Sequence, residues 1–129
     1  MSEFEPHPEG GSYRPVWRSE VGIPGLERVA ASCIAYRLAP GERSRWHRVA
    51  STELWLWQGG GDLRLATGGT GAAPSDATTM TVLGPGAVLQ HVVGPNEWQS
   101  AEPAGDAPVT VACVVVPGFD WRDWEVAHD

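Results

Sequence analysis

Short apolar segments separated by glycine and proline run through the whole chain, and this pattern constrains the fold more than any other feature. The sequence holds 16 glycines and 11 prolines in 129 residues, and they stand between the apolar runs. No long stretch repeats its apolar positions with the period of an amphipathic helix. Short strands joined by turns produce this punctuation. The pattern therefore predicts an all-β protein with roughly nine or ten short strands and little helix.

Several segments fit short strands, and their composition indicates how they are placed. The run at residues 109–116 is the most apolar in the chain, and we expect it in the centre of a sheet, because an exposed edge of that composition invites aggregation. Two sheets packed as a jelly roll, or one closed barrel, accommodate so many antiparallel strands in a chain of this length. The expected strands cover residues 16–20, 28–38, 45–49, 52–58, 62–67, 80–83, 88–93, 97–101 and 109–116.

The two ends of the chain differ from the middle. Residues 1–15 are rich in proline, glycine and acidic residues, and we expect an extended arm with a turn at Gly10-Gly11. At the other end we expect a final turn or a short helix capped by Asp120. The spacing of Trp121 and Trp124 would place both indoles on one face of that segment.

Charge and residue content exclude several functional classes. The net charge is −7, and residues 65–129 hold one arginine against eight acidic residues, which argues against a nucleic-acid partner. The chain has no lysine, which rules out Schiff-base chemistry and a phosphate-binding P-loop. No apolar run approaches the roughly 18 residues that span a bilayer, so we expect no membrane partner. The length suits a single domain over residues 1–129.

Both cysteines stand inside apolar runs, SCIAY for Cys33 and VACVVV for Cys113. In such surroundings a thiol usually behaves as a small buried hydrophobe, and the two have no CxxC spacing that would suggest a metal site. No basic segment followed by an apolar one opens the sequence. We therefore expect free thiols and a cytoplasmic protein.

Residues 41–60, GERSRWHRVASTELWLWQGG, carry the side chains that suggest a function. In a strand, successive side chains point to opposite faces, so Glu53, Trp55 and Trp57 share one face. His47 has the same parity if the strand continues through the intervening bend. A carboxylate and an imidazole beside indoles, all facing the interior of a barrel, predict a small-molecule pocket.

The spacing of this stretch resembles the first conserved motif of the cupin superfamily. That motif contains a glycine, two histidines, a glutamate and a second glycine. Val49 stands where the second histidine would be, and the other four positions are filled by Gly41, His47, Glu53 and Gly60. Further segments resemble the cupin family catalogued as a domain of unknown function, number 985, namely HPEGGSY, SRWHR, TELW, VVGPNEWQSAEP and PGFDWRDWEV. The resemblance implies a cupin-type double-stranded β-helix, or jelly-roll barrel, and a homodimer formed by sheet-to-sheet packing, with exchange of the arm as a further option.

The resemblance also implies four metal-ligand positions, and this chain fills them incompletely. His47 and Glu53 are retained, Gln99 is a weaker ligand in the second motif, and Val49 is aliphatic. Leu56 replaces a further histidine that is usual in the family. A stable catalytic metal normally has at least three good ligands from the protein. We therefore expect no cofactor, with a divalent transition metal on His47, Glu53 and Gln99 as the alternative.

His47 and Glu53 are the candidate catalytic residues. Burial among indoles disfavours a charged carboxylate and raises its pKa, whereas a protonated imidazole nearby has the opposite effect. Such a pair can act as acid and base in an isomerase, epimerase or cyclase that needs no metal. Two alternatives stay open. The pair can be a hydrogen-bonded remnant in a non-catalytic small-molecule binding protein, or part of a weakly metal-binding oxygenase or isomerase.

The remaining candidates are assigned by their positions. His7 and Glu9 match the N-terminal motif of the family and are interpreted as structural or dimer-forming, and His91 as a core residue. An arginine at the mouth of a barrel can hold an anionic group of a substrate, and tryptophan is enriched in ligand pockets. The expected substrate-binding residues are Arg45, Val49, Trp55, Trp57, Trp98 and Gln99.

Overall fold

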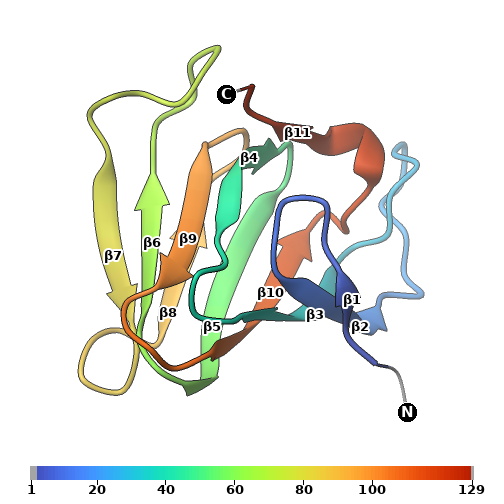
Figure 1. Cartoon of the computed structure of the whole chain (residues 1–129). Coiled ribbons are helices and arrows are strands. Elements are labelled where there is room, and N and C mark those ends of the chain that lie inside the picture. Colours follow the sequence, from blue (N-terminus) through green and yellow to red (C-terminus); the bar gives the residue numbers. More distant parts are fainter. Residues whose placement is uncertain (1–2, 129) are drawn as a thin grey trace.

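The computed structural model describes residues 3–128 as two antiparallel sheets (Figure 1). The strands are β1 (Glu5–Pro6), β2 (Ser12–Arg18), β3 (Ser32–Leu38), β4 (Ser44–Val49), β5 (Thr52–Gly60), β6 (Leu63–Thr67), β7 (Thr79–Leu83), β8 (Gln90–Val93), β9 (Gln99–Pro103), β10 (Val109–Val116) and β11 (Trp124–Val126), with one short 3₁₀-helix, η1 (Trp121–Asp123). One sheet has the order β1-β2-β3-β10-β5-β8 and the other β11-β4-β9-β6-β7. The predicted all-β jelly roll is confirmed.

The core fills one end of the space between the sheets. Strand β10 lies between β3 and β5, as its apolar composition predicted, and every second side chain of β10 is buried. The inward side chains at one end of β3 and β10 belong to the core, whereas those at the other end line a cavity. The core cluster consists of Tyr36, Leu38, Trp55, Leu63, Leu65, Leu83, Val93, Ala101, Val109, Val111 and Cys113.

The N-terminal segment differs from the extended arm expected for residues 1–15. Its described part forms a hairpin in which β1 pairs with β2, and β2 pairs with β3 through a register shift between Pro15 and Trp17. The turn at Gly10 and Gly11 is confirmed, and both glycines have positive φ angles of 113° and 72°. The strand expected at residues 16–20 therefore begins earlier, because the turn brings the chain back onto the edge of the sheet.

Gly10 stands where a side chain cannot fit. A Cβ atom at this position would lie 2.0 Å from the carbonyl oxygen of Arg43, and its φ of 113° is one that only glycine adopts readily. We expect Gly10→Ala to lower the free energy of unfolding by about 1–3 kcal/mol, measured by urea denaturation. Gly41→Ala is the matched control, since Gly41 also has a positive φ, of 87°, but no atom within 4 Å of the added Cβ. Equal losses in the two variants would contradict crowding as the cause.

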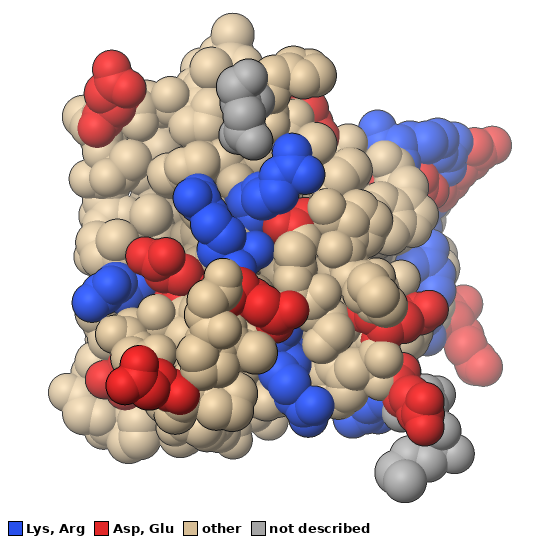
Figure 2. All heavy atoms as spheres, viewed as in Figure 1, with Lys and Arg blue, Asp and Glu red and all other residues tan. Residues whose placement is uncertain are grey.

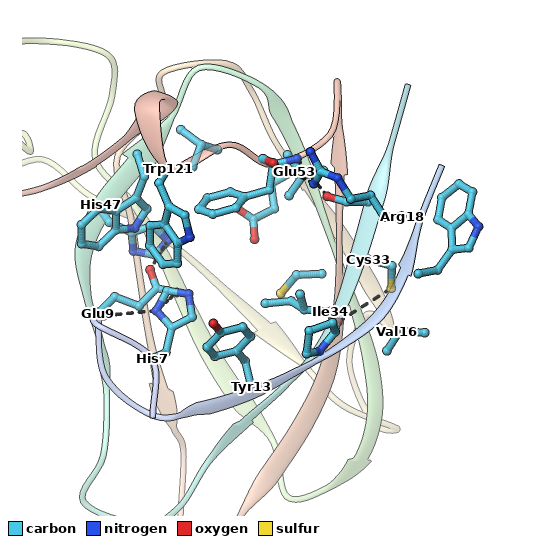
Figure 3. Close-up of a pocket in the computed structure, with 18 residues that line it drawn as sticks. His7, Glu9, Tyr13, Val16, Arg18, Cys33, Ile34, His47, Glu53 and Trp121 are labelled. Atoms are coloured by element: carbon cyan, nitrogen blue, oxygen red, sulfur yellow. Dashed lines mark hydrogen bonds and ion pairs between the residues drawn. The ribbon is translucent and has the colours of Figure 1, made fainter. Parts of the chain in front are cut away.

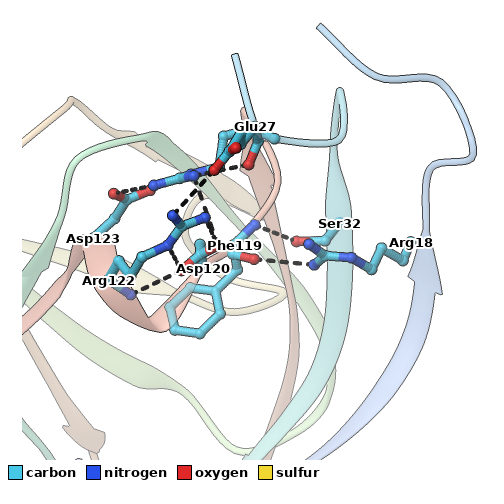
Figure 4. A network of polar contacts seen from close by, with 8 residues as sticks. Arg18, Glu27, Ser32, Phe119, Asp120, Arg122 and Asp123 are labelled. Atoms are coloured by element: carbon cyan, nitrogen blue, oxygen red, sulfur yellow. Dashed lines mark hydrogen bonds and ion pairs between the residues drawn. The ribbon is translucent and has the colours of Figure 1, made fainter.

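The C-terminal segment is tied to the loop between β2 and β3, and to the first residue of β3, by ion pairs and hydrogen bonds (Figure 4). Arg28 binds Asp123 through Nε and Nη2, at 2.9 and 2.8 Å. The Asp120 side chain accepts a hydrogen bond from the backbone N–H of Arg122, so it caps η1 as predicted. The rings of Trp121 and Trp124 lie 5.4 Å apart. These contacts hold the aromatic residues of this segment beside the cavity.

Cys33 is half-buried and Cys113 is buried, and both thiols are free. Within residues 3–128, no helix is long and apolar enough to cross a membrane. Acidic and arginine side chains are interspersed on the face shown in Figure 2, so neither sign of charge covers this face alone.

Candidate functional site

A cavity of about 390 Å³ lies between the sheets, at the end that the core does not fill. Its walls come from the N-terminal hairpin, from β3, β4, β5 and β10, and from the C-terminal segment (Figure 3). Most of the lining is apolar or aromatic, including Tyr13, Ile34, Val115, Phe119 and Trp121. A cavity of this size with a few polar groups among apolar walls is typical of a small-molecule site.

Glu9 and His47 form a buried ion pair in the wall of this cavity. Glu9 Oε2 lies 2.7 Å from His47 Nε2, and both side chains are less than a tenth exposed. Figure 3 shows Glu9 between His47 and His7. The backbone of Arg45 contacts both partners, because its N–H donates to the Glu9 carbonyl at 2.7 Å and its carbonyl oxygen lies 2.7 Å from His47 Nδ1. The N-terminal hairpin and β4 are thus joined at the site.

The surroundings of His47 favour its charged form. Burial alone lowers the pKa of His47, but the charge and hydrogen bond of Glu9, with smaller effects from Glu53 and the Arg45 carbonyl, raise it to about 9. Burial likewise raises the pKa of Glu9, yet the charge and hydrogen bond of His47 bring it below its ordinary value. With one ring nitrogen facing a carboxylate and the other a carbonyl oxygen, His47 is an imidazolium that donates from both nitrogens.

His7 differs from His47 in its charge state. Its Nδ1 accepts a hydrogen bond from the backbone N–H of Glu9 at 3.2 Å, which only a neutral ring can do. Burial lowers the pKa of His7, and this effect exceeds the attraction of Glu9. His7 therefore packs beside the ion pair as a neutral ring.

Glu53 is the third ionisable group of the wall. It lies in β5, and its Oε1 accepts a hydrogen bond from Gln99 Nε2 at 2.8 Å. Burial, assisted by the negative charge of Glu9, raises the pKa of Glu53 even though His47 and Gln99 favour its charged form. The site therefore combines a charged pair with a carboxyl group that binds its proton more tightly than usual.

The structure brings only part of the predicted set to the cavity. His47, Val49 and Glu53 line it, as expected from their shared parity. Trp55 lies in the core, where its indole N–H donates to Gln99 Oε1 at 2.7 Å, and Trp57 packs against the core. Both face inward with Glu53, but they lie further along β5, toward the filled end.

Three other predicted binding residues also lie away from the cavity lining. Trp98 is buried beneath Arg48 and donates to the Gly71 carbonyl at 2.9 Å. Gln99 is buried behind Glu53, and the Arg45 side chain is exposed. A substrate-binding role for these residues, and for Trp55 and Trp57, stays a prediction.

Other residues that line the cavity were not singled out for it by the sequence. His7 and Glu9 were assigned to structure or dimer formation, yet they lie beside His47. The aromatic wall comes from Phe119, Trp121 and Trp124, and Arg18 lines the cavity in place of Arg45. The turn at two glycines after Glu9 was the only signal that the arm folds back onto the sheet.

The residues implied as metal ligands do not fit a metal in this arrangement. Both nitrogens of His47 face oxygen atoms of the protein, and both ends of the Gln99 amide are hydrogen-bonded to Trp55 and Glu53. Val49 supplies no ligand atom. Among the described residues, no three His, Cys, Asp or Glu side chains are grouped so that they could hold an ion. No chemical step at this site is therefore assigned to a metal.

Known structures share this architecture. A hypothetical protein from Leishmania major is 28% identical, with a TM-score of 0.83 over 95% of this chain and 80% of the other. A protein from Shewanella oneidensis is 31% identical, with a TM-score of 0.84 over 95% and 77% of the two chains. A dTDP sugar isomerase from Desulfovibrio desulfuricans has a TM-score of 0.66 over 92% and 82%, and its 15% identity shows a common fold alone.

The sequence itself matches one family description. No curated protein matches the chain. A family model described as Cupin superfamily (DUF985) matches residues 2–127, which is nearly the whole sequence. The jelly-roll architecture and the similar solved structures agree with that match. The chain therefore belongs to the cupin superfamily, in the family described as DUF985.

Proposed function

We propose that this protein binds a small, partly apolar metabolite in the cavity and transfers a proton on it, as an isomerase, epimerase or cyclase does. The observation that carries the proposal is the cavity wall itself, where Glu53, with a raised pKa, accompanies the buried Glu9–His47 pair. Carboxyl groups whose environments separate their pKa values are the usual acids and bases of enzymes that work near neutral pH. The dTDP sugar isomerase with the same fold is compatible with this reaction class.

The proposed roles follow from the contacts of each group. Glu53 exchanges a proton with the substrate, since it lines the cavity and holds its proton more tightly than an ordinary glutamate. His47 keeps a positive charge beside the cavity, which stabilises negative charge that develops on the substrate. His47 Nε2 and Glu9 Oε2 share a second proton, and either partner can hold it. The proposed mechanism thus adds Glu9 to His47 and Glu53, the two residues predicted from the sequence.

Proton exchange with solvent tests the proposal before the substrate is known. The wild-type protein is incubated in deuterium oxide with small keto acids, ketoses and a dTDP-linked keto sugar, and deuterium uptake next to the carbonyl is followed by mass spectrometry. We expect uptake with at least one compound, and Glu53→Gln should slow it about 10²- to 10⁴-fold because the proton-transfer group is lost.

Binding and a matched variant control this experiment. Quenching of tryptophan fluorescence should show that Glu53→Gln still binds the compound within a few-fold, since Trp121 and Trp124 line the cavity. Glu102→Gln, an exposed glutamate away from the cavity, should leave the exchange rate unchanged. Undiminished exchange in Glu53→Gln would remove Glu53 from the mechanism.

A non-catalytic binding protein is the second candidate function. It is favoured by one observation, that both nitrogens of His47 and one oxygen of Glu53 already have partners within the protein. Polar groups that already have partners within the protein, in a mostly apolar wall, suit the binding of an apolar ligand. In that case a compound would quench the fluorescence of the wild-type protein without any deuterium uptake.

A further inference from the structure

A line of two hydrogen bonds leads from the core to Glu53. The indole Nε1 of Trp55 donates to Gln99 Oε1 at 2.7 Å, and Gln99 Nε2 donates to Glu53 Oε1 at 2.8 Å. Trp55 and Gln99 are at most 1% exposed and Glu53 is 7% exposed, so water does not compete for these bonds. The three residues come from β5, β9 and β5 again, and the line therefore joins the two sheets.

The indole fixes the orientation of the Gln99 amide. An indole nitrogen can only donate a hydrogen bond, so the carbonyl end of Gln99 must face Trp55 and its NH₂ end must face Glu53. The flipped amide would set two donors against each other and leave buried groups unpaired, which is unfavourable in the absence of water. The NH₂ group also only donates, and Glu53 Oε1 is consequently an acceptor at all times.

This arrangement favours one oxygen of Glu53 as the proton carrier. The carbonyl oxygen of a neutral carboxyl group accepts hydrogen bonds better than its hydroxyl oxygen, so the donor that faces Oε1 favours the O–H on Oε2. Glu53 lines the cavity, whereas Gln99 and Trp55 do not. The oxygen left free by Gln99 is thus the one available to a ligand. The other groups that act on Glu53 are His47 from β4, Glu9 from the hairpin and Cys113 from β10.

We propose that Gln99, oriented by Trp55, is a positioning residue that keeps the proton of Glu53 on Oε2 and so presents it to the cavity, an inference that rests on the proton-transfer function proposed above. Gln99 therefore has a role in the reaction although it does not line the cavity. Trp55 acts on Glu53 indirectly, because it orients the Gln99 amide that contacts Glu53.

Nuclear magnetic resonance of the wild-type protein gives the first test. With ¹³C-labelled glutamate, the Glu53 carboxyl resonance is assigned by its loss in Glu53→Gln and is followed through a pH titration. The side-chain NH₂ resonances of Gln99 should shift at the same pH as the Glu53 carboxyl, because the two groups are bonded. They should also exchange slowly with water. A Gln99 amide that is insensitive to the titration of Glu53 would overturn the proposal.

Two variants separate the roles of Gln99 and Trp55. Gln99→Met removes the donor to the charged carboxylate, so the pKa of Glu53 should move upward. Trp55→Phe leaves Gln99 in place but frees its amide to turn its carbonyl toward a neutral Glu53, and the pKa should again move upward. Trp57→Phe is the control, since the Trp57 indole donates to the Gly61 carbonyl and takes no part in the line. If one variant fails to fold, the other and the wild-type titration still decide.

The deuterium exchange rate distinguishes failure of this inference from failure of the proposed function. With proton transfer at Glu53, Gln99→Met should slow exchange about tenfold or more and move its pH profile upward with the pKa of Glu53. Absence of exchange in the wild type, with the expected resonance shifts, would contradict the enzymatic function and leave the proton position supported. Unchanged Glu53 titration in folded Gln99→Met and Trp55→Phe would contradict the role of Gln99, whatever the exchange rate.

Discussion

Replacing Glu9 with glutamine is expected to lower the free energy of unfolding by about 3–5 kcal/mol near pH 6. Glu9 is the partner that keeps the buried His47 charged, at 2.7 Å, and glutamine has nearly the same shape without the charge. The variant must either bury an unpaired imidazolium or release its proton, and both cost free energy in the folded state. Urea denaturation monitored by tryptophan fluorescence measures the loss.

The double variant Glu9→Gln/His47→Gln shows whether the loss comes from the pair. With both charges removed, no buried charge is left without a partner, so the double variant should be more stable than Glu9→Gln alone. Glu102→Gln changes a glutamate at the surface, where such substitutions usually change stability by less than about 0.5 kcal/mol. A double variant that loses the sum of the two single losses would show that Glu9 and His47 are not coupled.

Stability should also fall as the pH rises from about 6.5 through 9. The pKa of His47 is 6.5 before the effects of the fold and about 9 within it, so the folded state binds the proton more tightly. The stabilisation is complete below pH 6.5 and is lost as the pH rises through 9, by about 3 kcal/mol in all. The raised pKa of Glu53 has the same sign and begins to act above pH 4.5. The lowered pKa of Glu9 acts at the acid end, where its contribution is lost below pH 4.5.

Urea denaturation between pH 5 and 10 checks this profile, and the double variant Glu9→Gln/His47→Gln isolates the pair. Tyr36 and both cysteines also have raised pKa values and weaken the fold at alkaline pH, but they are present in the wild type and in the double variant. The difference between the two profiles therefore reports the Glu9–His47 pair together with the effect of its charges on the neighbouring groups. Parallel profiles between pH 6.5 and 9 would show that this pair does not set the alkaline limit.

Most of the fold was predicted from the alternation of apolar residues along the strands and from the turn residues between them. Strand β10 was recognisable because its apolar run is bounded by proline and glycine, and the cap at Asp120 because its carboxylate stands before a short polar and aromatic segment. The sequence also predicted that the side chains of His47, Val49 and Glu53 face the interior, because these residues stand an even number of positions apart. These features depend on neighbours in the chain, which a single sequence displays.

The sequence did not predict how far along the barrel a residue lies, or which distant residue it contacts. Parity assigns Trp55 to the inner face of β5 but does not say how far along the barrel it lies, and that distance decides between core and cavity. The partner of His47 is Glu9, on a distant hairpin that reaches it through a turn and a strand pairing. The register of such a pairing depends on packing across the sheet, which no local pattern encodes.

The ion pair depends on the backbone of residue 45 and not on its side chain. The backbone N–H and carbonyl of this residue connect Glu9 and His47, while the side chain points to solvent. Any residue except proline that keeps the strand conformation can supply those two contacts. Selection can therefore vary the amino acid at position 45 widely, and the geometric link between the two charged partners would leave no trace in residue conservation beyond the exclusion of proline.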